Sequence, residues 1–327
     1  MRPLFVDEMR GRLARALAVV VVLALWCAAA VMVRAAEPPT RVVIAYPPGG
    51  GTDIVGRIVL AQVEKNTGWR VVIENVPGAT GVIGTRQAAA AAPDGRTLLL
   101  GHTAPNAINP GDFTDPRQPV DWRLDPVALV ARAPSLLLVR PEVGAPGYGQ
   151  LVAWLRKAPR TYGSDGVGSQ AHLLMAGLLH QLGAERGAVH VPYKGGAPAL
   201  QGLMGGDVPV AFSPAPVALP HVTSGRFVVV AQTGDSRLPS LHDVPTLQEM
   251  GGPVLPALWW GLFAPVGTPE QVVQAWAREV ARALHAPAVV DALARQGLSA
   301  AYMPPGAFGA MLDRERRMYS AIGEKAQ

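Results

Sequence analysis

The sequence contains a single cysteine, Cys27, which lies in an N-terminal apolar stretch. The rest of the chain can therefore form no disulfide and exposes no thiol to an oxidising compartment. The seven histidines show no H-E-x-x-H or other spacing typical of metal ligands, so no metal site is predicted.

Clusters of Lys and Arg are also missing. The formal net charge of +5 includes +3 from residues 1–36, where five Arg stand against Asp7 and Glu8, which leaves +2 for the remainder. This near-neutral body argues against nucleic acid as a partner.

The first 36 residues are predicted to be a secretory signal peptide. Several Arg precede the apolar run ALAVVVVLALWCAAAVMV, and small residues follow it at positions suited to cleavage near Ala35 or Ala36. The run is long for a signal peptide, so an uncleaved membrane anchor is the alternative. Trp26 stands where lipidation of Cys27 would need a small residue.

From residue 41 onward, short β-type runs alternate with helical ones, which is typical of an α/β layer fold. No low-complexity linker divides the chain, so we expect any hinge to be made of strands, with PSLLLVRP leading into a second lobe and FVVVAQ leading back. Thr268, Pro269 and Glu270 are expected to start a helix as N-cap, N1 and N2. Trp259 and Trp260 are both expected to pack in a core.

The glycine-rich stretch YPPGGGTDIVGR, residues 46–57, precedes a predicted helix. It lacks the Lys-Ser/Thr of a Walker A loop, and Ile54 occupies the place of the third glycine of a dinucleotide-binding loop. The free N–H groups of a helix N-terminus suit a carboxylate as well as a phosphate. Asp53 lies in the first turn, where it either contacts a ligand or caps the turn.

A second glycine loop, YGSDGVGSQAHL, opens another predicted helix at residues 162–173. Two such loops facing each other would hold the two ends of a small acid. Neither loop contains the G-x-S-x-G of a hydrolase. A Ser169–His172 nucleophile and base pair is disfavoured, because no third residue orients it. We expect His172 to anchor the helix by hydrogen bonding, and His190 to be structural.

Seven stretches in register resemble the Bug family of periplasmic solute-binding proteins, the TctC-like receptors of tripartite tricarboxylate transporters. They are PPGGGTD, VVIENVPGATGVIG, APDGRTLLLG, GSDGVGSQAHL, VPYKGGAPALQGLMGGDV, LPSLHDVPTLQEMG and WWGLFAPVGTP. The resemblance implies an α/β fold of the two-lobed, type II Venus-flytrap kind, with mixed sheets, helices on both faces and a strand hinge. Lobe 1 would comprise residues 37–134 and 233–327, and lobe 2 residues 135–232.

The resemblance also implies a periplasmic monomer without catalysis or cofactor, which captures a small organic carboxylate by hinge closure. Its partners would be membrane permease subunits; docking on a sensor kinase is the alternative, and a hydrolase using Ser169 is the third hypothesis. The family tends toward Gly and Asn where this chain has Thr80 and Val82, so the identity of the acid stays open. The residues expected to contact the ligand are Tyr46, Pro48, Gly49, Gly50, Asp53, Thr103, Ala104, Asn106, Ser164, Gly168, Ser169, Gln170 and Ser213.

Overall fold

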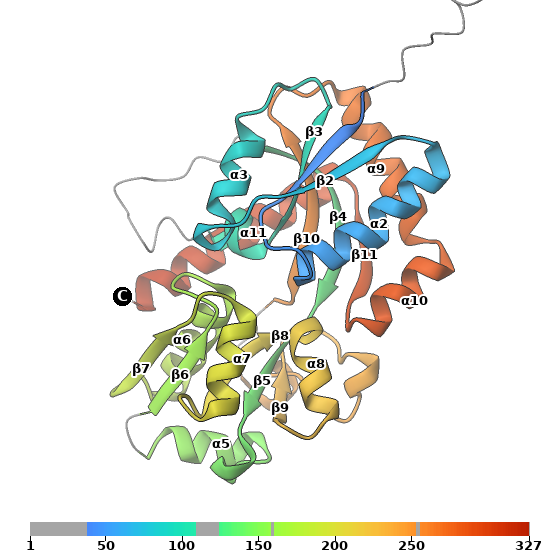
Figure 1. Ribbon diagram of the computed structural model, residues 1–327. Coiled ribbons are helices and arrows are strands. Elements are labelled where there is room, and N and C mark those ends of the chain that lie inside the picture. Colours follow the sequence, from blue (N-terminus) through green and yellow to red (C-terminus); the bar gives the residue numbers. More distant parts are fainter. Residues whose placement is uncertain (1–37, 109–123, 158–159, 253–255, 327) are drawn as a thin grey trace, which may run out of the picture. The chain divides into compact units, whose positions relative to one another are not determined.

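The computed structural model describes residues 38–108, 124–157, 160–252 and 256–326. The predicted signal peptide lies outside the described residues. The chain from Pro39 to Gln327 forms one compact unit, and its described strands build two separate sheets (Figure 1).

The first sheet has six strands in the order β11-β4-β10-β3-β1-β2. Strand β1 runs parallel to β2 and β3, whereas β10 runs antiparallel to β3 and β4, and β11 antiparallel to β4. The sheet is therefore mixed. The strands are β1 (Thr40–Ile44), β2 (Val71–Asn75), β3 (Thr97–His102), β4 (Leu124–Ala133), β10 (Leu258–Pro265) and β11 (Ser299–Met303).

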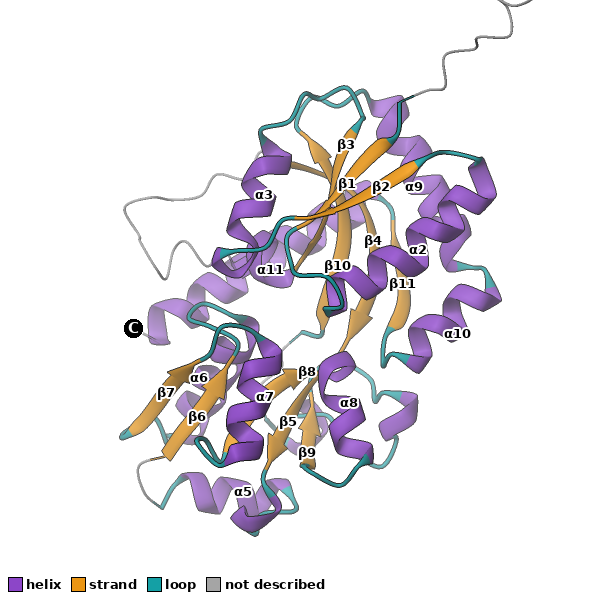
Figure 2. Cartoon of the chain, in the orientation of Figure 1, coloured by secondary structure: helices purple, strands orange, loops and turns teal. Residues whose placement is uncertain are grey.

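Helices cover both faces of the first sheet because successive strand residues point to opposite sides. Val42 and Ile44 of β1 pack in a core with three helices, and Val43 packs in a second core with two others. The first group is α2 (Gly51–Thr67), α9 (Glu270–Leu284) and α10 (Pro287–Arg295), and the second is α3 (Val82–Ala89) and α11 (Pro305–Ala326) (Figure 2).

The second sheet has five strands in the order β7-β6-β8-β5-β9. Strand β6 runs parallel to β7 and β8, and β5 runs antiparallel to β8 and β9. Two helices pack on each face. The strands are β5 (Ser135–Val139), β6 (Arg160–Ser164), β7 (Ala188–Pro192), β8 (Val210–Pro214) and β9 (Val228–Gln232), and the helices are α5 (Tyr148–Leu155) and α6 (Gln170–Leu182) on one face, α7 (Gly196–Gly205) and α8 (Ala215–Thr223) on the other.

Extended strands connect the two sheets, as the sequence predicts. Only Pro134 separates β4 of the first sheet from β5 of the second. The backbone N–H of Ser135 donates to the Thr233 hydroxyl at 2.9 Å, and the N–H of Thr233 donates to the carbonyl of Ser135 at 3.0 Å. The outgoing and returning chains are thus bonded side by side. The predicted α/β fold, with mixed sheets and a strand hinge, is confirmed.

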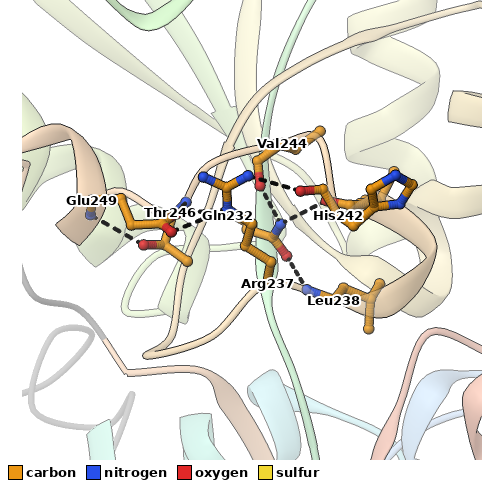
Figure 3. A network of polar contacts seen from close by, with 8 residues as sticks. Gln232, Arg237, Leu238, His242, Val244, Thr246 and Glu249 are labelled. Atoms are coloured by element: carbon orange, nitrogen blue, oxygen red, sulfur yellow. Dashed lines mark hydrogen bonds and ion pairs between the residues drawn. The ribbon is translucent and has the colours of Figure 1, made fainter.

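The returning segment folds around the buried amide of Gln232 at the end of β9 (Figure 3). Its Nε2 donates to the carbonyls of Leu241 and Val244, and its Oε1 accepts from the N–H of Leu238 at 2.8 Å. Gln232 therefore fixes the path of the chain just after it leaves the second sheet.

A second set of contacts in Figure 3 closes this segment from the solvent side. Arg237 Nε lies 3.1 and 2.9 Å from the two carboxylate oxygens of Glu249, and its Nη1 donates to the carbonyl of His242. Glu249 also accepts from the N–H of Thr246, whose hydroxyl accepts from the N–H of Glu249 in return. This reciprocal pair is a capping box at a short helical turn.

Two finer predictions concern the burial of Trp259 and Trp260 and the start of helix α9. Trp259 and Trp260 are 0% and 2% exposed and pack in the two different cores of the first sheet, which confirms that both are core residues. The expectation that Thr268 caps a helix is wrong. Helix α9 has Pro269 as its N-cap, and the Thr268 hydroxyl donates to the carbonyl of Pro265 at 2.7 Å, which secures the preceding turn.

Candidate ligand-binding site

The loop between β1 and α2 forms the first part of the site. Gly50 is the N-cap of α2 and supplies no side-chain cap. Within the described part of the chain, the N–H groups of Gly51, Thr52 and Asp53 have no hydrogen-bond acceptor. A helix N-terminus with unused N–H groups carries a partial positive charge and attracts anions.

The buried carboxylate of Asp53 holds this loop in place through hydrogen bonds. Its carboxylate, 3% exposed, accepts from Gly49 N at 2.9 Å, Arg57 Nε at 2.8 Å and Asn75 Nδ2 at 3.0 Å. Burial alone would raise the pKa of Asp53, but the hydrogen bonds from Arg57, Gly49 and Asn75 outweigh it and the pKa is lowered. Asp53 thus stays ionised and holds Gly49 in its left-handed conformation (φ 79°). A direct contact between Asp53 and a ligand stays a prediction.

The loop between β6 and α6 forms the second part. Ser169 is the N-cap of α6, and its hydroxyl accepts from the backbone N–H of His172 at 3.2 Å. The His172 ring accepts through Nδ1 from the N–H of Gly168 at 3.3 Å. His172 therefore anchors the start of α6 to its loop by hydrogen bonding, as predicted. Its ring Nδ1 accepts from the backbone N–H of Gly168, whereas a hydrolase would require a hydrogen bond between this ring and the Ser169 hydroxyl.

Stacked aromatic rings support the second loop. The His172 and His190 rings are 4.0 Å apart and nearly parallel, and Tyr162 stacks on His190 at 5.1 Å. His190 Nε2 lies 2.6 Å from the hydroxyl of Ser164. Burial, together with the neighbouring His172, lowers the pKa of His190 to about 4, and burial lowers the pKa of His172. Both rings are neutral at neutral pH, which favours close stacking.

The two loops approach each other around Tyr46, Thr80 and Gly166. The Tyr46 hydroxyl donates to the carbonyl of Thr80 at 2.8 Å. Burial, and then the charge of Asp165, raises the pKa of Tyr46 well above its usual range. A Cβ placed on Gly166 would lie 3.5 Å from Thr80 Oγ1. The structure thus brings the loop of the first sheet beside the loop of the second.

The segment after β3 lies next to Tyr46. The Tyr46 and His102 rings are 4.4 Å apart, and burial lowers the pKa of His102 to about 3. A π-helical turn, η2 (Ala104–Ile108), follows. The side chains of Thr103 and Asn106 bond within the protein: Thr103 Oγ1 accepts from Trp259 N, and Asn106 Oδ1 accepts from His102 N. Contacts of Thr103 and Asn106 with a ligand stay a prediction.

Gln170 and Ser213, two more of the predicted residues, lie in different environments. Gln170 is buried at the hinge, where its Oε1 accepts from the Ser135 hydroxyl at 3.1 Å and its Nε2 donates to the Tyr319 hydroxyl at 3.0 Å. It thereby joins α6 to β5 and α11. Ser213 is also buried, and its hydroxyl has no hydrogen-bond partner among the described residues.

Comparison with known proteins identifies the family. A sequence profile of the tripartite tricarboxylate transporter family receptor matches residues 55–322. The chain belongs to this receptor family. Protein BugT of Bordetella pertussis is 34% identical over 271 residues, which cover 82% of each chain.

Solved structures agree with this assignment. The periplasmic binding protein BugD superposes with a TM-score of 0.77 at 29% identity, covering 89% of this chain and 98% of that one. MatC from Rhodopseudomonas palustris, solved with malate, superposes with a TM-score of 0.75 at 29% identity, covering 87% of this chain and 98% of that one. The R. palustris protein Rpa4515, solved with adipate, superposes with a TM-score of 0.78 at 28% identity, covering 88% of this chain and 97% of that one.

The family consists of solute-binding receptors, so the prediction that the chain is not an enzyme is confirmed. In the part of the chain that the structure describes, no helix has both the length and the apolarity needed to cross a membrane. The same residues contain no group of His, Asp or Glu arranged to hold a metal ion.

Proposed function

We propose that this chain is a periplasmic receptor that binds a small organic carboxylate between two lobes and closes on it. The lobes are residues 37–134 with 233–327, and residues 135–232; residues 1–36 direct export. The observation that carries the proposal is the pair of glycine loops, because each leads into a helix N-terminus and both lie against Thr80, through Tyr46 of the first loop and Gly166 of the second.

The available donors favour a carboxylate. Besides the α2 amides, the first N–H groups of α6, those of Gln170 and Ala171, have no acceptor among the residues described. The free hydroxyl of Ser213 adds a donor near the second loop, since Ser213 lies two residues beyond Ala211, which pairs with Gly163 just before that loop. Malate and adipate in the two related structures are acids of the proposed class.

Contacts to both lobes would favour the closed state, since the open state cannot make them together. Gln170 supports this view because it connects α6 with the hinge and with α11. The receptor would then present its closed form to membrane permease subunits of a tripartite tricarboxylate transporter. A sensor kinase is the alternative partner.

A thermal-shift screen of the purified protein tests the proposal. Di- and tricarboxylates, hydroxy acids, acidic amino acids and aromatic acids are compared with sugars and simple cations. A ligand of the native state raises the melting temperature by mass action, so at least one acid is expected to do so. A shift produced by sugars or cations and by none of the acids would overturn the proposal.

A further inference from the structure

Asp165, in the middle of the second loop, has an oxygen that the protein leaves without a partner. Its Oδ1 is buried, yet no donor reaches it from the described residues. Buried polar atoms are nearly always hydrogen-bonded, so an exception in a folded protein calls for an explanation.

The surroundings of Asp165 do not compensate its charge. Among the described residues, Asp165 takes part in no ion pair, and Arg57, which lies in the helix that follows the first loop, is already bonded to Asp53. Burial raises the pKa of Asp165, while the Ser169 hydroxyl and the amide of Asp165 itself act in the opposite direction. Oδ1 therefore has no compensating donor among the described residues.

The position of Asp165 places it where a bound acid would lie. It precedes Gly166, which faces Thr80, and its charge acts on Tyr46 in the other loop. A plain carboxylate ligand would bring a second negative charge toward it and would leave Oδ1 unbonded. A ligand with a hydrogen-bond donor beside its carboxylate would satisfy the helix N-termini and Asp165 together.

We propose that Asp165 is a specificity-determining residue that accepts a hydrogen bond from a hydroxyl or ammonium group adjacent to the ligand's carboxylate. The inference rests on the proposed function and narrows its ligand class to 2-hydroxy and 2-amino acids. Sites built to bond a ligand donor reject analogues that lack it, because a buried polar group is then left unpaired.

Isothermal titration calorimetry with matched acids tests this. Succinate, malate and aspartate share one carbon skeleton and differ only at carbon 2; glutarate, 2-hydroxyglutarate and glutamate repeat the comparison with one more methylene. In at least one set, a substituted acid is expected to bind about tenfold more tightly than the unsubstituted one, or better. Equal or tighter binding of the unsubstituted acid in each set that binds would overturn the inference and leave the proposed function intact. Binding of none of the six acids, together with no acid hit in the thermal-shift screen, would overturn both.

Two variants assign the preference to Asp165. Asp165→Ala should bring the affinities of the substituted and unsubstituted acids to within about threefold of each other. Asp165→Asn keeps an acceptor oxygen but loses the charge, so it should retain a preference for the hydroxy acid and lose one for the amino acid. These arms distinguish the two donors.

The control is Asp243→Asn, which removes a side chain that is 90% exposed and should leave every affinity unchanged. Circular dichroism and the melting temperature confirm that each variant is folded. A preference that persists unchanged in folded Asp165→Ala would show that another residue reads the donor.

Discussion

The two glycine-rich loops each contain one aspartate, and the two carboxylates lie in opposite environments. Asp53 accepts three hydrogen bonds from its own loop, its helix and β2, which together lower its pKa. Asp165 has a buried oxygen without a donor among the described residues, and burial raises its pKa. The hydrogen bonds to Asp53 stabilise the fold, whereas the oxygen of Asp165 that lacks a donor is the one that we propose bonds to a ligand.

The loops also differ in what lies beneath them. The first is held by an ionised carboxylate and Asn75, and the second by the neutral rings of His172 and His190. The second loop is therefore expected to weaken as the pH falls from 6.5 toward about 4, because protonation of His190 is disfavoured in the folded protein, whereas Asp53, with its lowered pKa, stays ionised over this range.

The largest expected effect comes from removing Asp53. In Asp53→Ala the N–H of Gly49 and the amide of Asn75 lose their acceptor, and the first loop loses its closing contacts. We expect the free energy of unfolding to fall by about 2–4 kcal/mol, as for the loss of buried charge-assisted hydrogen bonds. Urea denaturation at pH 7 measures it.

The matched control for this prediction is Asp165→Ala, which removes the same side chain from the other loop. It should lower the free energy of unfolding much less than Asp53→Ala does, because burial disfavours the ionised Asp165 and no described donor loses a partner at Oδ1. Equal losses in both variants would show that the two aspartates have the same structural role.

The second effect is a pH dependence of stability that arises at His190. Its pKa in the folded protein is about 4, below the usual 6.5, so the unfolded chain binds the proton more readily. Stability from the neutral ring is complete above pH 6.5 and is lost as the pH falls toward about 4. His190→Gln should therefore show a flatter pH profile.

The difference between wild type and variant is the quantity to measure, by urea denaturation between pH 4 and 7. Glu315 is buried with its pKa raised to about 7, so its own contribution changes over this range in the opposite direction and cancels in the difference. A difference that stays constant with pH would mean that His190 titrates normally.

Local patterns in the sequence predict most of the fold, because hydrophobic spacing and glycine turns act over a few residues. The strand β4 is an exception. Pro126 is unusual inside a strand, and no strand is predicted there. The structure accommodates it opposite Phe263, where the pairing with β10 shifts in register.

The same reasoning predicts which loops build the candidate site, but not what each side chain contacts. Gln170 bonds to Ser135 and Tyr319, which are 35 and 149 positions away in the sequence. Whether Asp165 Oδ1 has a hydrogen-bond donor likewise depends on which groups the fold brings near it. From the sequence alone, the negative charge of Asp165 would only suggest that anions are repelled from this loop. Long-range packing decides both.

A smaller effect is expected when only the charge of Asp165 is removed. An acid whose folded pKa is raised binds its proton more readily in the folded protein, so stability decreases as the pH rises above 3.8. Asp165→Asn without ligand should gain up to about 1 kcal/mol at pH 7 and nothing below pH 3.8. Urea denaturation at the two pH values checks this, and a loss of stability at pH 7 would contradict it.

The smallest effect concerns Thr80, which follows β2 of the first sheet and faces Gly166 of the second loop. Thr80 has φ 51° and ψ 38°, a left-handed conformation that is strained for a β-branched residue. Thr80→Gly removes this strain and keeps the carbonyl that accepts from Tyr46, so we expect a gain of about 0.5–1 kcal/mol after the entropic cost of glycine. Ala79→Gly, at φ 47°, is the control and should gain less because alanine is not β-branched. Should Thr80→Gly instead lower the urea midpoint, the Thr80 side chain would be a necessary contact at the junction of the two loops rather than a site of strain.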